Sequence, residues 1–203
     1  MSFRRLSLLA AALLLTATVV VTSARAQTAV ISDFTLKRAD NSALTLSSLS
    51  GKKAVVVVFT NPGCAFSRVY QSRLTDLASA YASQGVELLL VSAPIRLMDQ
   101  PAEGTDVGKI KVKTTGAEPA LLTDDDMKTA TLLGINRTSE AVVLQPVAGG
   151  YTIRYRGAID DNAQMETNVR EAYLKNAIDA VLAGQKASIA NKPALAGCII
   201  KKN

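Results

Sequence analysis

Two apolar runs separated by one helical stretch place the strongest constraint on what this chain can fold into. Residues 54–59 read Ala-Val-Val-Val-Val-Phe and residues 86–91 read Val-Glu-Leu-Leu-Leu-Val. Apolar runs of this length, with β-branched residues in the first, are typical of strands buried in a mostly parallel sheet. Between them apolar residues recur at helical spacing from Tyr70 to Tyr81, and Gly85 stands where a helix C-cap belongs. The sequence therefore predicts a strand, turn, helix, strand unit with a right-handed crossover.

The remaining pattern predicts two hairpins, two further helices and a tail. A polar turn at residues 39–42 between short apolar segments predicts a hairpin over residues 34–46. The three aspartates at 124–126 are expected to cap a helix, with a metal site as the alternative. In chain order the other expected elements are an irregular insertion over residues 93–123 with one short helix, a helix over 127–133, a hairpin of strands 141–145 and 151–156, a helix from 167 to 183, and an irregular tail over 184–203.

This order of elements predicts an α/β fold with a central mixed β-sheet and helices on both faces. The second hairpin makes one side of the sheet antiparallel. We therefore expect a thioredoxin-like fold that carries an N-terminal hairpin extension and an irregular C-terminal tail. One domain over residues 27–203 is the expectation from the length of the chain, which has 203 residues.

The first 26 residues differ from the rest and are predicted to be a signal peptide. Arg4 and Arg5 precede the apolar run at residues 6–21, and the sequence Ala24-Arg25-Ala26 offers a small-x-small cleavage site. A membrane anchor is the alternative, but the run is short against the roughly 20 residues that a bilayer requires. We expect cleavage after Ala26 and a periplasmic or otherwise exported protein, with contact to the membrane only through the signal peptide before cleavage.

Composition excludes several classes of function. The chain contains no histidine and two cysteines, which removes Ser/His/Asp hydrolases, Cys/His proteases and zinc-imidazole sites. The formal net charge of +6 includes three arginines of the predicted signal peptide. The chain has no basic patch interleaved with aromatic residues, so nucleic acid is not an expected partner. No metal site and no cofactor are expected.

Export bears on how the two cysteines are interpreted. In an oxidising compartment Cys64 and Cys198 are a disulfide, a reactive pair or two buried thiols. A static link would close a loop of more than 100 residues, worth about 5 kcal/mol by chain entropy, so a structural bridge is a serious possibility. Cys64 directly follows a predicted buried strand and begins a helix, a position where the helix dipole lowers the pKa of a thiol. The alternative for Cys64 is an inert buried thiol.

Several motifs carry a resemblance to a known family. They are the strand ending in Val58-Phe59 with the following turn, cysteine and helix, the sequence Arg-Thr-Ser-Glu at 137–140, Arg-Gly-Ala-Ile-Asp-Asp-Asn at 156–162, and Gly-Cys-Ile-Ile-Lys at 197–201. The chain resembles the redoxin superfamily of thioredoxin-like proteins, and within it the AhpC/TSA-type branch that is peroxiredoxin-like and thiol-disulfide oxidoreductase-like. The resemblance covers nearly all of the chain after residue 26.

Departures from the pattern of that family bear on function. The family commonly has Cys-x-x-Cys, whereas this chain has Asn61-Pro62-Gly63-Cys64, so exchange between two cysteines of one local motif is excluded. Ser139 replaces a proline that is usually cis in such folds; because a cis bond before serine costs roughly 3 kcal/mol, we expect a trans bond and an altered substrate groove. Peroxiredoxins carry a threonine three residues before the cysteine; Asn61 has that place here, with Thr60 adjacent.

The resemblance implies a thiol oxidoreductase with Cys64 as nucleophile and Cys198 as the resolving thiol, since Cys198 is the second thiol of the chain. Gly197 on a mobile tail would permit the approach; alternatively the tail is pinned elsewhere and Cys198 is packed. The expected substrate contacts are Thr60, Ser67, Arg137, Thr138 and Ser139. The partners would be a protein thiol or disulfide, or a peroxide, and an external reductant. The alternatives are a peroxide-reducing antioxidant on the same cysteine, or a catalytically degenerate redoxin that acts as a binding protein.

Overall fold

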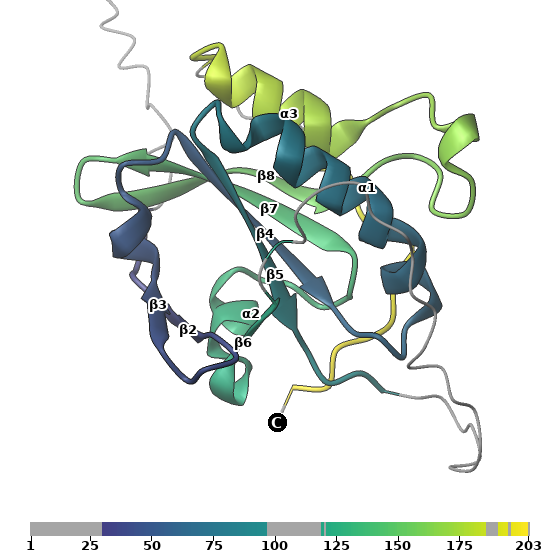
Figure 1. Cartoon of the computed structure of the whole chain (residues 1–203), viewed down its shortest axis with the longest axis horizontal. Coiled ribbons are helices and arrows are strands. Elements are labelled where there is room, and N and C mark those ends of the chain that lie inside the picture. Colours follow the sequence, from purple (N-terminus) through teal and green to yellow (C-terminus); the bar gives the residue numbers. More distant parts are fainter. Residues whose placement is uncertain (1–29, 97–118, 120, 186–190, 195, 203) are drawn as a thin grey trace, which may run out of the picture.

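The protein folds around one mixed sheet of eight strands. The computed structural model describes residues 30–96, 119, 121–185, 191–194 and 196–202 (Figure 1). Across the sheet the strands follow the order β1-β8-β7-β4-β5-β6-β2-β3. The strands are β1 (Val30–Ile31), β2 (Thr35–Lys37), β3 (Ala43–Thr45), β4 (Ala54–Thr60), β5 (Val86–Ser92), β6 (Leu121–Thr123), β7 (Glu140–Val147) and β8 (Gly150–Ala158). The helices are η1 (Leu46–Leu49), α1 (Ala65–Ala82), η3 (Asp125–Met127), α2 (Lys128–Leu132), η4 (Glu166–Asn168) and α3 (Tyr173–Leu182).

The predicted strand, turn, helix, strand unit forms the centre of the molecule. Strands β4 and β5 are parallel in the register Ala54↔Val86 to Thr60↔Ser92, and α1 connects them. Strand β7 pairs with β4 and β8 pairs with β7, both antiparallel, which confirms the second hairpin. The predicted N-terminal hairpin is β2 and β3, which joins the sheet through β6. These pairings confirm the thioredoxin-like α/β fold.

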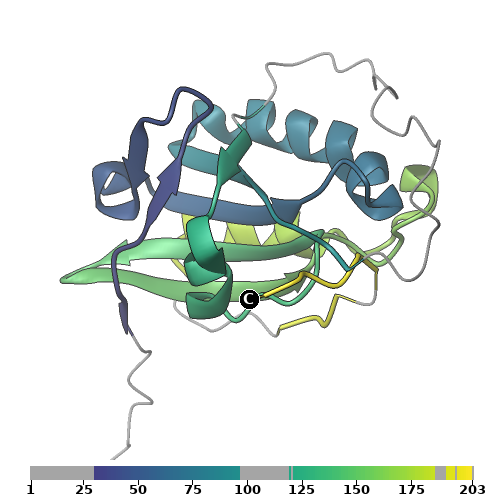
Figure 2. The ribbon, with the colours of Figure 1, turned by 90° about the horizontal axis from the view of Figure 1, so that it is seen from below.

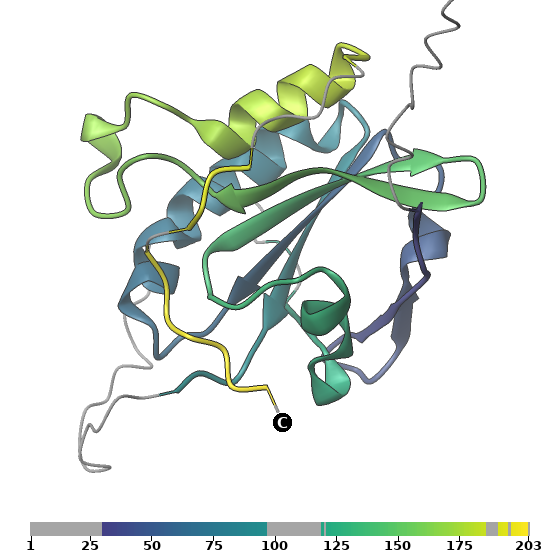
Figure 3. The same ribbon diagram turned by 180° about the vertical axis from the view of Figure 1, so that it is seen from behind.

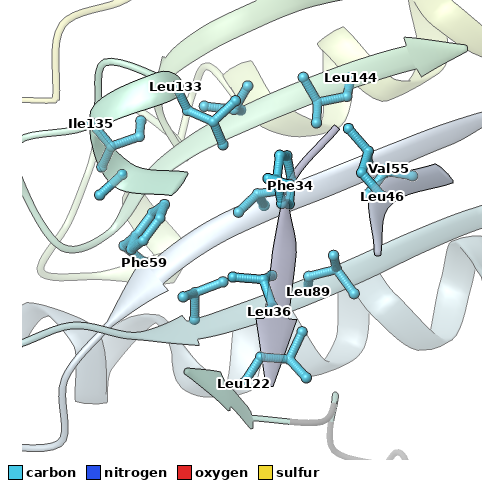
Figure 4. Close-up of a cluster of buried hydrophobic side chains, with 14 of the residues drawn as sticks. Phe34, Leu36, Leu46, Val55, Phe59, Leu89, Leu122, Leu133, Ile135 and Leu144 are labelled. Carbon is cyan, nitrogen blue, oxygen red and sulfur yellow. The ribbon is translucent and has the colours of Figure 1, made fainter. Parts of the chain in front are cut away.

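Helices cover both faces of the sheet, as expected. Helices α1 and α3 lie side by side on one face, and α2 lies on the opposite face (Figures 1 and 3). The view from below sets α2 and the β2–β3 hairpin on the near side of the sheet (Figure 2). Because β4 is covered on both sides, six of its seven residues are buried, and side chains alternate between two hydrophobic clusters. Figure 4 shows the cluster on the α2 side, to which Phe34 and Leu36 of the N-terminal segment and Phe59 of β4 all belong.

Several elements differ from the sequence-based expectation. Strands β1 and β6 were not predicted, because two or three residues carry no readable alternation and gain their stability from the strands beside them. The last helix begins at Tyr173 rather than at residue 167, since η4 and a bend precede it. Residues 97–118 of the predicted insertion and residues 1–29, with the predicted signal peptide, lie outside the described residues.

Of the aspartates at 124–126, Asp124 takes the capping role that the sequence favoured, whereas Asp125 and Asp126 form ion pairs with Lys37 and Lys128. The two carboxylate oxygens of Asp124 accept hydrogen bonds from the amides of Thr129 and Ala130, at 3.0 Å and 2.9 Å, in the first turn of α2. These amides have no partner within the helix, so the carboxylate stabilises its start. Among the described helices, none is long and apolar enough to cross a membrane.

Candidate active site

Cys64 lies at the end of the turn between β4 and α1, where it is the N-cap residue of α1. Its side chain is fully buried. The turn is closed locally, because the amide of Cys64 donates to the carbonyl of Asn61 at 2.9 Å. The side chain of Asn61 also accepts a bond from the amide of Gly63 and donates to the carbonyl of Ala93, at 2.8 Å and 2.7 Å. The turn that carries Cys64 is therefore fixed by its own hydrogen bonds and by the end of β5.

Cys198 forms a disulfide with Cys64. The two Cα atoms are 5.9 Å apart, within the range that a disulfide spans, although 134 positions separate them in the sequence. Of the arrangements that the sequence left open, the structure has the disulfide. The sequence also allowed a tail that is attached elsewhere, but in the structure the tail is attached at Cys64.

Thr138 connects the two cysteines through its side chain. Its hydroxyl donates to Sγ of Cys64 at 3.2 Å and accepts a hydrogen bond from the amide of Cys198 at 2.9 Å. The amide of Thr138 also donates to the carbonyl of Cys198 at 2.9 Å. Thr138 is fully buried, so these bonds form away from water. The expected substrate contact at Thr138 is occupied in this structure by the tail of the chain.

Ser139, at the position of the family's proline, follows a trans peptide bond, as expected for serine. Its φ of 60° lies in the left-handed region, which a residue with a Cβ rarely adopts. Its amide donates to the carbonyl of Phe59 at 2.8 Å, which anchors this loop to the end of β4. The Ser139 side chain is buried, and its hydroxyl has no partner among the described residues. Ser139 also lines a pocket of about 320 Å³ together with Tyr70, Asp160 and Lys192.

The other three predicted contact residues, Arg137, Thr60 and Ser67, differ in what they contact. Nη1 of Arg137 donates to the carbonyl of Gly197, directly before Cys198, at 3.2 Å. Thr60 contributes a backbone contact, because its carbonyl accepts from Ala93 at 3.0 Å. Ser67 is buried, and its hydroxyl accepts from the amide of Asn61 at 3.2 Å. The structure therefore brings Arg137 to the tail, whereas Thr60 and Ser67 stabilise the turn below Cys64.

The tail strand, residues 198–201, inserts between two other segments, which we call the tail-binding edges: residues 94–96 and residues 136–138. On the first edge, Arg96 donates to the carbonyl of Ile199, and Lys201 donates to the carbonyl of Pro94, both at 2.9 Å. On the second edge, Ile200 donates to the carbonyl of Asn136 at 2.9 Å, in addition to the contacts of Thr138. Sequence reasoning missed the first edge entirely; the only available signal was the β-branched pair after Cys198.

The motif at 156–162, which resembles the family pattern, has two structural roles that sequence reasoning did not find. At its start, the amide of Ala158 donates to the carbonyl of Lys192 at 2.7 Å, which fixes the tail to the end of β8. A Cβ on Gly157 would lie 1.9 Å from that carbonyl oxygen, so glycine is required for this approach. Farther along, Asp160 accepts bonds from the Tyr70 hydroxyl and from Arg73 of α1, at 2.8 Å and 2.7 Å.

The cluster of Tyr70, Arg73 and Asp160 holds α1 to the loop after β8. Both side chains of the Arg73–Asp160 pair are less than a tenth exposed. Burial, followed by the hydrogen bond to the Asp160 carboxylate, raises the pKa of Tyr70 well above its usual value. The hydroxyl of Tyr70 therefore stays protonated and remains a hydrogen-bond donor over the physiological pH range.

The fold and this site define a class: a thioredoxin-like protein with one disulfide at the N-terminus of the helix that follows the central strand. More particularly, the chain belongs to the AhpC/TSA family, whose model matches residues 28–166. This confirms the redoxin superfamily indicated by the sequence motifs, and it agrees with the expectation of a thiol oxidoreductase. A search of the curated proteins finds no match.

Solved structures show the same fold. A hypothetical protein from Sinorhizobium meliloti 1021 is 26% identical, with a TM-score of 0.67 over 86% of this chain and 93% of that chain. An uncharacterised conserved protein from Geobacillus kaustophilus is 22% identical, with a TM-score of 0.65 over 86% and 91%. A putative thioredoxin from Neisseria meningitidis is 16% identical, with a TM-score of 0.50 over 77% and 91%.

Proposed function

We propose that this protein is an exported thiol-disulfide oxidoreductase in which Cys64 is the attacking thiol and Cys198 the resolving thiol. The observation that carries the proposal is the disulfide between these two residues at the N-terminus of α1. Once the disulfide is reduced, the helix N-terminus and the Thr138 hydroxyl both favour a thiolate at Cys64. The thiolate is the nucleophilic form of cysteine, so Cys64 would be the reactive member of the pair.

In the reducing direction the reaction has two exchange steps. The Cys64 thiolate attacks one sulfur of a substrate disulfide, forms a mixed disulfide and releases the other substrate sulfur as a thiolate. The Cys198 thiolate then attacks Sγ of Cys64, which restores the internal disulfide and releases the second substrate thiolate. The substrate gains two electrons and the cysteine pair loses two, and an external dithiol must return them.

The burial of the two cysteines favours one route for this return. Cys64 is fully buried and Cys198 is half-buried, so an incoming thiolate reaches the Cys198 sulfur more easily. Attack there expels the Cys64 thiolate, which would be the better leaving group because the helix N-terminus and the Thr138 hydroxyl stabilise it. The reductant is then joined to Cys198, and its second thiol resolves that mixed disulfide.

The five residues proposed as substrate contacts have two different roles. Arg137, Thr138 and Ser139 would contact the substrate directly, because they belong to or adjoin the loop that contacts Cys198. Thr60 and Ser67 would act through the turn that positions Cys64. The signal-peptide pattern at residues 1–26 supports export to the periplasm or beyond.

Trapping experiments test the proposal. Full-length Cys198→Ser protein, reduced and then mixed with a model protein disulfide such as insulin, should accumulate a mixed disulfide at Cys64. The matched Cys64→Ser variant should form none, and wild-type protein should form only a transient one. A folded protein that exchanges with neither the protein disulfide nor hydrogen peroxide would overturn the proposal in favour of a binding protein. A much faster reaction with hydrogen peroxide, with sulfenic acid at Cys64, would identify a peroxide-reducing antioxidant instead.

A further inference from the structure

The tail strand is hydrogen-bonded along both of its sides. Its backbone makes four backbone–backbone hydrogen bonds at 2.9 Å, two with residues 94–96 and two with residues 136–138. The amide of Cys198 adds a fifth bond to the Thr138 hydroxyl. An extended segment held in this way is recognised mainly through its backbone, as in strand addition to a sheet. Any extended polypeptide with acceptable side chains could make the same bonds.

The two isoleucine side chains of the tail strand meet different environments. Ile199 is 41% exposed, whereas Ile200 is 4% exposed and belongs to the hydrophobic cluster on the α2 side of the sheet. This alternation is the normal consequence of an extended backbone. The position directly after the cysteine therefore accepts any side chain, and the next position selects an apolar one.

The residue before the cysteine is the most restricted. Gly197 has a φ of 122°, and a Cβ built on it would lie 2.0 Å from the carbonyl oxygen of Thr138. That oxygen belongs to the backbone of a fully buried residue, so it cannot move aside without displacing the chain around it. A chain with a side chain at this position cannot adopt the same register beside Cys64.

We propose that the tail-binding edges form the substrate site of this protein, and that the tail strand is their resident occupant. The site takes an extended polypeptide with the pattern Gly-Cys-x-apolar, whose cysteine forms the mixed disulfide with Cys64. This inference rests on the proposed thiol-disulfide exchange and names its substrate class. Because the tail belongs to the same molecule, it competes at a high effective concentration and closes the site whenever no substrate holds it open.

Activated peptides test the proposal on the full-length Cys198→Ser protein. The parent peptide copies residues 196–201, with its cysteine linked to 5-thio-2-nitrobenzoate, and attack by the Cys64 thiolate joins the peptide to Cys64 and releases the coloured thiolate. Peptides carrying Gly197→Ala or Ile200→Ser should react at least about tenfold more slowly than the parent, because they clash or leave the apolar site unfilled. The peptide with Ile199→Ser is the matched control and should react like the parent, since that side chain is exposed.

A second protein variant tests whether the tail competes. Adding Gly197→Ala to the Cys198→Ser protein puts a Cβ against Thr138 and should displace the tail. The parent peptide should then react several-fold faster than with Cys198→Ser alone. Gly149→Ala is the matched control, because Gly149 also has a positive φ but a Cβ there meets nothing within 4 Å. A variant that merely damaged the site would react more slowly, so the direction of the change is decisive.

The outcomes separate failure of this inference from failure of the proposed function. If all four peptides react equally fast, or if displacing the tail does not accelerate the parent peptide, the inference is overturned. A small disulfide such as 2-hydroxyethyl disulfide provides the independent measurement, because it needs no strand pairing. If Cys64 reacts readily with that disulfide but does not discriminate among the peptides, thiol exchange stands and the Gly-Cys-x-apolar site does not. If Cys64 reacts with neither, the proposed function itself fails.

Discussion

The two halves of the disulfide are built in different ways. Cys64 follows a strand that is buried along almost its whole length and begins a helix of 18 residues. The contacts that hold its turn come largely from residues close in the sequence. Cys198 lies in a segment of isolated bridges, and its contacts reach residues 94–96 and 136–138, far along the chain. The attacking thiol is thus part of the fold, whereas the resolving thiol is docked onto it.

This difference suits a two-step exchange. An attacking sulfur has to be held in one geometry at the helix N-terminus, where its thiolate is stabilised. A resolving sulfur has to leave while the substrate is bound and then return. Main-chain hydrogen bonds contribute only about 0.5 to 1.5 kcal/mol each in net terms, and ordering the tail offsets much of that gain. The tail is therefore expected to stay in place through the covalent bond and to exchange once that bond opens.

The largest expected effect comes from removing the covalent bond. Replacing both cysteines, Cys64→Ser and Cys198→Ser, opens a loop closed across 134 positions and should lower the free energy of unfolding by up to about 5 kcal/mol. Urea denaturation of oxidised wild type, reduced wild type and the double variant measures the effect. Reduced wild type should behave like the double variant. A loss below about 1 kcal/mol would show that the covalent bond adds little to the stability of the fold and would contradict this prediction.

The second prediction concerns the attachment of the tail to β8. Gly157→Ala places a Cβ 1.9 Å from the carbonyl oxygen of Lys192, so the strand end or the tail must move. We expect a destabilisation of about 2 to 3 kcal/mol, in the range of overpacked sites. Gly51→Ala is the control, because its Cβ would meet nothing within 4 Å. Equal urea midpoints for the two variants would show that the tail moves aside without a loss of unfolding free energy.

The fold was predictable because its signals are local. The runs at 54–59 and 86–91, the helical spacing between them and the hairpin around Gly149 each carry their own periodicity, and each element formed where expected. Strand β6 was not predictable, since three residues acquire strand geometry from β5 and β2 on either side. The predicted start of the last helix was wrong for the opposite reason. The apolar spacing continues through this segment, but the backbone bends at η4.

Both cysteines of the site were predictable from the sequence, but most of the contacts around Cys198 were not. A cysteine after a buried strand and before a helix has a recognisable position, and Thr138 followed from the family motif. Two features of the site depend on contacts between residues far apart in sequence, which no spacing encodes. Thr138 bridges both cysteines, and Pro94 and Arg96 bind the tail. The requirement for Gly197 appears only once the Thr138 carbonyl is placed beside it.

The third prediction tests the Thr138 hydroxyl, which touches both halves. Thr138→Val preserves the shape of the side chain and removes the hydrogen bond to Sγ of Cys64. In the reduced protein the pKa of the Cys64 thiol should rise, and alkylation near neutral pH should slow by roughly tenfold, equivalent to the loss of one charged hydrogen bond. Thr152→Val is the matched control, because the buried Thr152 hydroxyl has no partner among the described residues. Identical pH profiles of alkylation for the two variants would contradict a role of Thr138 at the thiolate.

The smallest expected effect lies on the Cys64 side alone. Tyr70→Phe removes the hydroxyl that donates to Asp160, which should cost about 1 kcal/mol at neutral pH, because Arg73 still pairs with the carboxylate. Burial and then the bond to Asp160 raise the pKa of Tyr70 above its ordinary value of 10.0 in the folded protein. The unfolded chain therefore loses this proton first, so the stability from Tyr70 is complete below pH 10 and declines as the pH rises above it.

Tyr70→Phe should accordingly flatten the decline in unfolding free energy above pH 10, as measured by urea denaturation at a series of pH values. Part of the decline should remain, because burial also raises the pKa of Tyr155, and Tyr155→Phe should remove that part. The flattening should be the same in the oxidised protein and in the protein without cysteines, since the hydrogen bonds from Tyr70 and Arg73 to Asp160 join α1 to the loop after β8 and not to the tail. If the flattening depended on the disulfide, the Tyr70 cluster would be coupled to Cys198, and the two halves of the disulfide would not be independent.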